Sequence, residues 1–234
     1  MKVFKIILTL LSVAATVAFL RFENYLTGTS LVVAFLLYFL SSAIHLLVHE
    51  SGHFIGGVVS EYKLLCLQLG PMNIVVGTNN KPSILWKGSL SGQCVMLPKH
   101  IDNVRFKAYN MGGILANAIL MIFSFALLLM DSFWTLLLFV ELICVGIQKI
   151  IVNAVPHKTN SVPNDGYIVK LLKKDKAIQK DYATYLRLYG KLFLDEDISP
   201  QDYKYEREVS EDEDEMLYYN EIQDILNSLT PANN

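Results

Sequence analysis

Four long apolar segments constrain the fold of this chain more than any other feature of its sequence. They cover residues 3–22, 31–59, 109–130 and 133–155. A helix needs roughly 20 mostly apolar residues to cross a bilayer, and each segment reaches that length. The chain of 234 residues is 53% hydrophobic and only 18% charged, whereas soluble domains carry about 25% charge. The sequence therefore predicts an α-helical polytopic membrane protein with about four transmembrane helices.

The first apolar segment and the distribution of basic residues predict where the protein and its termini lie relative to the membrane. Lys2 and Lys5 precede a stretch that could be a cleaved signal peptide, but its full spanning length favours a retained helix. Lys and Arg gather at the start of the chain, in the 60–107 loop and after the fourth segment. The positive-inside rule then predicts a multi-pass protein of the cell membrane with both termini in the cytoplasm. The net charge of −2 argues against a nucleic-acid partner.

The sequence divides into three regions: an N-terminal helix with a short outer loop (1–30), a membrane core (31–170) and a cytoplasmic C-terminal region (171–234). Within the core, the 60–107 loop alternates short apolar runs with Gly, Pro and Asn. This pattern predicts a small β-rich insertion between the second and third helices. Four strands are expected, at residues 64–69, 73–76, 83–86 and 93–97.

The C-terminal region contains two stretches with helical spacing and an acidic segment between them. Helical spacing over residues 167–193 and 216–229 predicts two helices. Between them, the segment 195–215 holds eleven acids against two bases. Such a segment is usually a solvated, often disordered linker, which is the favoured interpretation here. The alternative is a binding site for a regulatory partner with a basic surface.

The second apolar segment contains His49–Glu50–Ser51–Gly52–His53, an HExxH pattern. On a helix, positions i and i+4 share one face about 6 Å apart along the axis, so the two imidazoles can bind one zinc ion. Glu50 can then take a proton from water that the metal activates. The alternative, two core histidines and a buried glutamate, is costly because ionisable groups in hydrocarbon are rare.

Catalytic zinc needs a third protein ligand. His45 lies on the same helix face, but residues 45–53 span about 12 Å, so we expect it to support the ligands or line a pore. Asp165 is the better candidate, because it follows the fourth segment on the side where His53 is expected; taken alone, an Asp-Gly turn is the simpler interpretation. Glu141 is a further intramembrane carboxylate. Two placements for it stay open: the outer interface, or a bond to a neighbouring helix.

Three motifs together resemble the site-2 protease family of intramembrane zinc metalloproteases. They are His49–His53 followed by Gly56–Gly57, the run Gly112–Gly113–Ile114–Leu115–Ala116–Asn117, and Asn153–Ala154–Val155–Pro156 followed by Asp165–Gly166. The resemblance covers roughly residues 31–170, and the 60–107 loop is too short to hold a PDZ domain. Read by themselves, Gly112 and Gly113 are more simply explained as small residues that let helices pack closely.

The resemblance implies a site and an activity. His49, His53 and Asp165 would bind Zn²⁺, Glu50 would be the general base, and Asn153 would assist catalysis near the substrate backbone. Asn117 would have a structural or substrate-contacting role. The expected protein is a membrane-embedded zinc metalloendopeptidase. Its substrate would be a membrane-spanning protein or a hydrophobic peptide precursor, which an edge strand of the insertion could bind by strand addition.

Two other functions remain open on the sequence alone. One is an inactive zinc-binding membrane scaffold, against which the intact Glu50 argues. The other is a metal or proton transporter in which His45, His49, His53 and Glu141 form a polar path. The lack of a visible inverted repeat makes the transporter less favoured.

Overall fold

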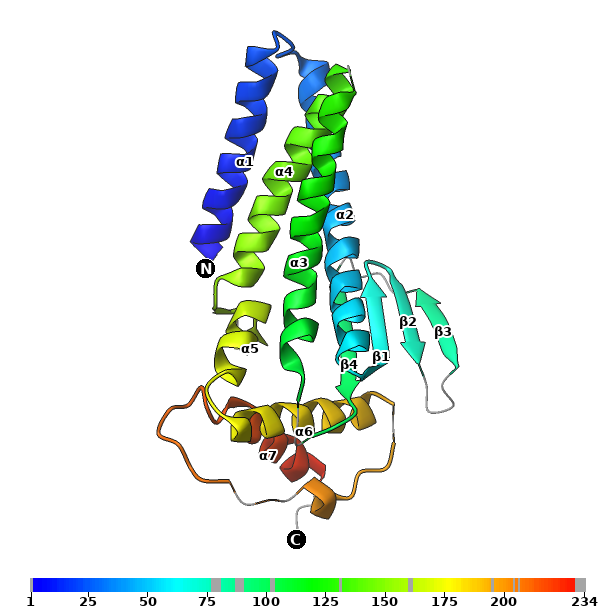
Figure 1. The fold of residues 1–234 in the computed structure, drawn as a ribbon, viewed down its shortest axis with the longest axis vertical. Helices are drawn as coiled ribbons and strands as arrows, with labels where there is room; N and C mark the ends of the chain where they lie inside the picture. The colour runs from blue at the N-terminus through cyan, green and yellow to red at the C-terminus, as the bar shows by residue number, and fades with distance from the viewer. Residues whose placement is uncertain are drawn as a thin grey trace.

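The computed structural model describes residues 2–76, 81–86, 91–101, 104–130, 132–159, 162–194, 196–203, 205 and 207–229. Four of its helices are long and apolar enough to cross a membrane: α1 (Lys2–Phe22), α2 (Gly28–Val59), α3 (Phe106–Ser124, continued by a 3-10 turn at Phe125–Leu129) and α4 (Phe133–Ala154). These helices confirm the four apolar segments as helices and are compatible with a membrane protein. They run alternately up and down, so the N-terminus lies toward the same end as the sheet and the C-terminal helices (Figure 1).

The α2–α3 pair forms the tightest contact of the bundle. A Cβ atom placed on Gly52 would lie 2.3 Å from the carbonyl oxygen of Gly112 and 2.6 Å from Cβ of Ala116. Since no side chain fits there, glycine lets the two backbones touch. This confirms that Gly112 serves close helix packing.

Helix α1 packs on α4 through polar as well as apolar contacts. Thr16 Oγ1 donates a hydrogen bond to Glu141 Oε1 (2.8 Å), and Gln148 Nε2 donates one to Thr9 Oγ1 (2.8 Å). Glu141 is only 2% exposed. Of the two placements considered for Glu141, the structure has the bond to a neighbouring helix.

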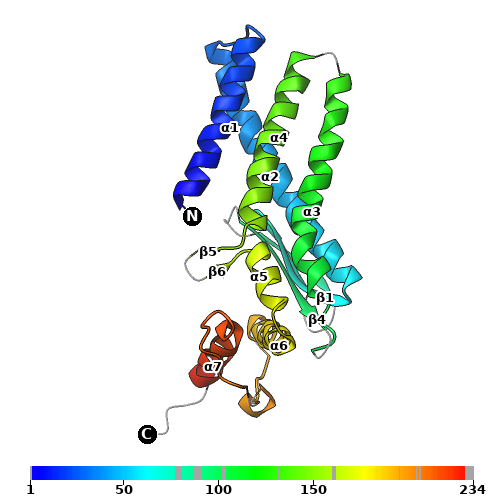
Figure 2. The ribbon, with the colours of Figure 1, turned by 60° about the vertical axis from the view of Figure 1, so that its left-hand side comes forward.

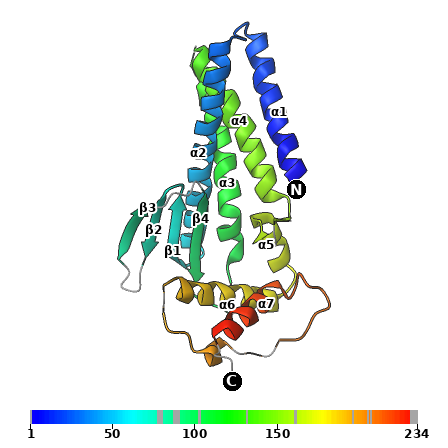
Figure 3. The same cartoon turned by 180° about the vertical axis from the view of Figure 1, so that it is seen from behind.

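The insertion between α2 and α3 forms a four-stranded antiparallel sheet in the order β3-β2-β1-β4. Its strands are β1 (Tyr62–Leu69), β2 (Met72–Val76), β3 (Pro82–Trp86) and β4 (Gly92–Pro98). All four predicted strands are present. The sheet lies beside the lower part of α2, as Figures 1 and 3 show from opposite sides. Strands β3 and β4 are its two edges.

After α4, a short hairpin leads into three helices. The hairpin is β5 (Lys158–Thr159) and β6 (Val162–Pro163), and the helices are α5 (Asp165–Leu172), α6 (Lys176–Phe193) and α7 (Leu217–Leu229) (Figure 2). The expectation of one helix over residues 167–193 is wrong. The chain breaks at residues 173–175, because Asp175 caps α6 by accepting a hydrogen bond from the backbone nitrogen of Ala177 (3.2 Å).

The described acids of the acidic segment are exposed or half-exposed, as expected for a solvated linker, but three of them form ion pairs that the prediction did not include. Lys174 Nζ pairs with Asp212 (2.7 Å) and Glu215 (2.9 Å), and Lys158 pairs with Asp214. Helix α7, which follows, buries Tyr218, Ile222 and Leu226 in clusters that include side chains of α6. The acids therefore fold back onto the basic stretch that precedes them, and apolar burial by α7 holds the segment there.

Candidate metal centre

His49, His53 and Asp165 meet at one point near the end of α4. The two Nε2 atoms are 3.1 Å apart, and Asp165 Oδ2 lies 3.2 Å from that of His49 and 3.3 Å from that of His53. Oδ2 is buried and has no well-formed hydrogen bond to any described residue. Three potential ligand atoms this close, one of them a buried carboxylate oxygen, can hold a metal ion.

Asp165 is ionised at neutral pH. Burial by itself would raise the pKa of this carboxyl, but without a metal ion the N–H groups and positive charge of protonated His49 and His53 outweigh burial and lower the pKa to about 2. Asp165 therefore contributes a negative charge to the site at neutral pH.

Asn164 positions Asp165, which lies 112 residues from His53 along the chain. Its Oδ1 accepts a hydrogen bond from the backbone nitrogen of Tyr167 (2.9 Å), which caps α5. Its Nδ2 donates to the carbonyls of Val152 and Val155 (both 2.8 Å) at the end of α4. One side chain therefore ties the first turn of α5 to α4 and places Asp165 beside the histidines. Asn before a helical run is a recognisable N-cap signal, so this role of Asn164 could have been found from the sequence.

Both histidines are held so that Nε2 faces the common point. His53 donates a hydrogen bond from Nδ1 to the carbonyl of Tyr109 (2.7 Å). This fixes the tautomer in which Nε2 has a free lone pair, as metal-binding histidines require. A backbone carbonyl has no sequence signature, so this partner could not be predicted.

His49 is held through a chain of side chains that includes His45. The Asn117 amide lies between them, with Oδ1 3.0 Å from Nδ1 of His45 and Nδ2 3.3 Å from Nδ1 of His49. Nε2 of His45 is 3.0 Å from the carbonyl of Leu142. A 180° turn of the amide exchanges its oxygen and nitrogen. In that orientation every imidazole is neutral: His49 donates to Asn117, Asn117 donates to His45, and His45 donates to Leu142.

His45 is therefore a partner behind the ligands, as the sequence analysis favoured, and it is absent from the group that can hold the metal. Asn117, which is fully buried, supplies the link between the two histidines. Gly113 makes room for the ligands: a Cβ there would lie 2.6 Å from Nδ1 of His49 and 2.7 Å from Nε2 of His53. Of the two adjacent glycines, Gly112 thus serves helix packing and Gly113 serves the metal centre.

Glu50 and Asn153 line the same cavity as the three ligands. Glu50 is 7% exposed and accepts a hydrogen bond from the backbone nitrogen of Cys94 in β4. Asn153 donates from Nδ2 to the carbonyl of Lys149 (3.0 Å), one turn earlier in α4. The structure therefore brings together all five residues that were proposed for the site, although the side chain of Asn153 is engaged with its own helix.

The cavity beside the ligands has a volume of about 420 Å³. Its walls come from α2, α3, α4, α5, α6 and β4, with Gly92, Gln93 and Cys94 contributed by the sheet. An edge strand thus forms one wall, next to the general-base candidate Glu50.

Comparison with known proteins finds no matching family model, curated protein or solved structure for this chain. The resemblance to site-2 proteases therefore remains a prediction that depends on the motifs.

Proposed function

We propose that this protein is a membrane-embedded zinc metalloendopeptidase of the site-2 protease type. The observation that carries the proposal is the convergence of the three ligand atoms, which are 3.1–3.3 Å apart. Two ligands about 2.05 Å from a tetrahedral zinc ion are about 3.3 Å apart. The spacing of the ligand atoms therefore fits zinc before any ion is bound.

The donor set also fits a catalytic role. Two imidazole nitrogens and one carboxylate oxygen suit zinc, and three protein ligands leave one tetrahedral position open. A zinc ion held there would supply a Lewis acid that makes water nucleophilic near neutral pH and polarises a carbonyl group. His49 and His53 would keep their orientation through Asn117 and the Tyr109 carbonyl.

Glu50 is the proton carrier in this proposal. It follows His49 directly and lines the ligand cavity, so its carboxylate is placed to take the proton of the attacking water. The same group then returns the proton to the departing amine when the peptide bond breaks. The bond from the Cys94 backbone nitrogen holds the carboxylate at the sheet edge, where a substrate would enter.

The substrate we propose is a membrane-spanning protein or a hydrophobic peptide precursor. Such a segment hides its carbonyls in helical hydrogen bonds and must open before hydrolysis. Strand β4 offers an edge for the opened segment, but its Cys94 is already occupied. The carbonyl of Cys94 accepts a hydrogen bond from the Tyr109 hydroxyl (2.7 Å), and its nitrogen donates to Glu50. An incoming strand must pair elsewhere along β4 or displace these contacts.

We further propose that the end of the bundle bearing the sheet and the metal centre faces the cytoplasm. The basic residues of the 60–107 loop and of the stretch after α4 lie at this end. The transporter alternative has less support, because His45 and Glu141 belong to separate hydrogen-bonded groups among the described residues.

Replacement of Glu50 by Gln tests the proposal. The full-length protein would be reconstituted in liposomes with a panel of fluorescence-quenched single-span peptides. We expect the wild type to cleave members of the panel, and Glu50→Gln to lose at least about 1000-fold in rate while keeping its zinc. Lys173→Gln, which changes an exposed residue outside the ligand cavity, is the control.

Two results would count against the proposal. Cleavage by Glu50→Gln at the wild-type rate would remove Glu50 from the chemistry. A wild type that binds zinc and cleaves nothing in the panel would favour the inactive scaffold.

A further inference from the structure

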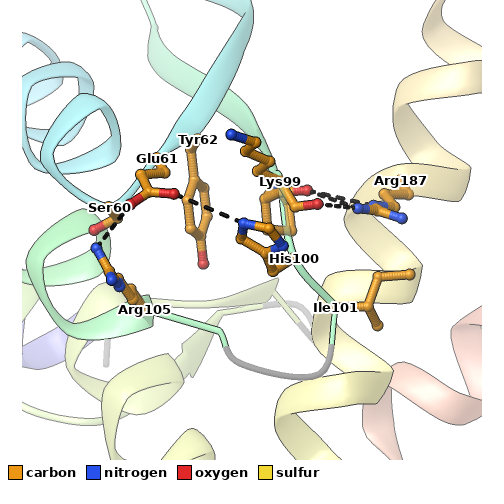
Figure 4. Close-up of a pocket in the computed structure, with 9 residues that line it drawn as sticks. Ser60, Glu61, Tyr62, Lys99, His100, Ile101, Arg105 and Arg187 are labelled. Carbon is orange, nitrogen blue, oxygen red and sulfur yellow. Dashed lines mark hydrogen bonds and ion pairs between the residues drawn. The ribbon is translucent and has the colours of Figure 1, made fainter.

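A second cavity, of about 560 Å³, lies away from the metal centre at the ends of α2 and α3. Ser60 directly follows the last residue of α2, and Arg105 directly precedes the first residue of α3. Figure 4 shows these residues around the cavity together with Tyr62 of β1 and Lys99 and His100 from beyond β4. The cavity therefore opens where two candidate membrane spans end.

The floor of this cavity holds two hydroxyl groups without partners. Ser60 and Tyr62 are 5% and 6% exposed, and neither hydroxyl makes a hydrogen bond to any residue that the structure describes. In Figure 4 the Tyr62 hydroxyl points into the space between Arg105 and His100. A buried hydroxyl without a partner is costly, so two in one cavity indicate a polar ligand that accepts their hydrogen bonds.

The rim of the cavity is positively charged. Its lining holds three cations, Lys99, Arg105 and Arg187, and one carboxylate, Glu61, which leaves two positive charges without counting His100. The Arg187 guanidinium already donates hydrogen bonds to the carbonyls of Pro98 and Lys99 (Figure 4). Glu61 already pairs with Arg105 (3.0 Å) and lies 3.7 Å from His100. Hydroxyl donors, together with a cation such as Lys99, are groups that bind a phosphate.

An adjoining cavity of about 420 Å³ shares Ser60 and Arg105 with the first. Val59, Val104 and Phe106 supply much of its wall, and Val59 is 67% exposed. A charged cavity next to an apolar one, at the ends of two candidate spans, matches a molecule with a phosphate head and acyl chains.

We propose that this cavity binds the phosphate group of an anionic phospholipid. The phosphate accepts hydrogen bonds from Ser60 and Tyr62 and pairs with Lys99, while the start of the acyl chains lies along Val59. This inference rests on the proposed placement of α2 and α3 in a membrane, with this end facing the cytoplasm, where anionic lipids gather. It does not rest on proteolysis.

Thermal unfolding of the full-length protein in neutral detergent tests the site. Dioctanoyl-phosphatidylglycerol is titrated in, with dioctanoyl-phosphatidylcholine and inorganic phosphate as separate arms. A ligand that binds only the folded state raises its stability by an amount set by the ratio of ligand concentration to Kd. We expect stabilisation by the anionic lipid, at an apparent Kd at least about tenfold tighter than for the other two.

Tyr62→Phe and Lys99→Gln are the informative variants. Each should weaken binding of the anionic lipid about tenfold, because each removes one contact with a charged phosphate. Without lipid, Tyr62→Phe should unfold at the same or a higher temperature, since it removes a hydroxyl without a partner. Lys173→Gln, outside the cavity, should bind like the wild type.

Three results would overturn the proposal. They are wild-type affinity in both cavity variants, equal stabilisation by the zwitterionic lipid, and inorganic phosphate binding as tightly as the anionic lipid. Because the readout is lipid binding, the outcome is independent of whether the protein cleaves peptides.

Discussion

Asp165 and Glu141 each carry a buried carboxylate oxygen, but the groups around these two oxygens differ. Each has an oxygen without a hydrogen bond among the described residues, Oδ2 in Asp165 and Oε2 in Glu141. Around Asp165, two imidazole nitrogens approach within 3.3 Å. Around Glu141, the other oxygen accepts one hydrogen bond from Thr16 of α1, and the free oxygen lies in a region where the described cavity is lined mostly by apolar side chains.

The contrast shows which surroundings allow a carboxylate to serve as a metal ligand. A missing hydrogen bond alone is not sufficient, since Glu141 has that feature too. Convergence of other lone-pair donors, each fixed by a partner behind it, is what distinguishes the Asp165 site. Glu141 joins two helices, whereas Asp165 completes a ligand set.

The largest effect should come from filling the space beside the histidines. Gly113→Val places side-chain atoms where Nδ1 of His49 and Nε2 of His53 now lie. Zinc affinity should fall by more than about 100-fold, which exceeds the usual loss on removing a partner of a ligand. Competition with a chelator measures it. Gly28→Ala is the control, because nothing lies within 4 Å of a Cβ at Gly28; equal affinities in the two variants would contradict the account.

Removal of the Asn117 amide should have the next largest effect. Asn117→Ala breaks the link between His45 and His49, so the His49 ring loses its fixed orientation. We expect zinc affinity to fall about 10- to 100-fold in the same chelator assay. Ser41→Ala is the control on the same helix as His49, since the buried Ser41 hydroxyl has no hydrogen bond among the described residues. Unchanged affinity in Asn117→Ala would show that the chain of side chains does not support the ligand.

For Glu141 we expect changes in the free energy of unfolding and no change in zinc binding. A double-mutant cycle of Thr16→Val and Glu141→Gln, followed by unfolding in bicelles, measures the coupling across α1 and α4. We expect about 0.6 kcal/mol, as for other hydrogen bonds between membrane helices. Neither variant should change zinc affinity. Zero coupling would mean that the Thr16 contact contributes nothing, and a loss of zinc would mean that the two carboxylates are not independent.

The smallest effect should come from the acidic segment. Bonding to Lys158 and Tyr167 lowers the pKa of Asp214 below its ordinary value of 3.8. A lowered folded-state pKa stabilises the fold above pH 3.8, and the stabilisation disappears as the pH falls through the lower folded-state value. The protection factors of α7 amides, corrected for the intrinsic exchange rate at each pH, should therefore fall below pH 3.8, and added salt should lower them at neutral pH. Asp214→Asn should remove this part of the pH dependence; an unchanged profile would contradict the assignment.

The sequence predicts much of the fold because its signals are local. Hydropathy gives the four spans, alternation and turn residues give the four strands, and HExxH spacing gives the histidine pair. The break before α6 was missed because a single cap, Asp175, outweighs a helical pattern on both sides. The ion pairs of the acidic segment were missed because charge composition does not say that the matching bases, Lys158 and Lys174, lie nearby in space.

The candidate ligands could be predicted from the sequence, but most of the groups that orient them could not. Asp165 was assigned from a resemblance, because nothing local distinguishes it from an ordinary Asp-Gly turn. The Tyr109 carbonyl leaves no trace in the sequence, since every residue has one. The roles of Asn164 and Asn117 depend on contacts across 9 to 12 and 68 to 72 residues respectively, which a reading of neighbouring residues does not reveal.

Metal analysis of the purified full-length protein, after gentle extraction, tests the central claim most directly. The matched pair is Asp165→Asn and Glu141→Gln, which make the same chemical change in the two carboxylates. We predict about one zinc ion per chain in the wild type and in Glu141→Gln, and almost none in Asp165→Asn. A metal-free wild type, or full zinc content in Asp165→Asn, would contradict the account.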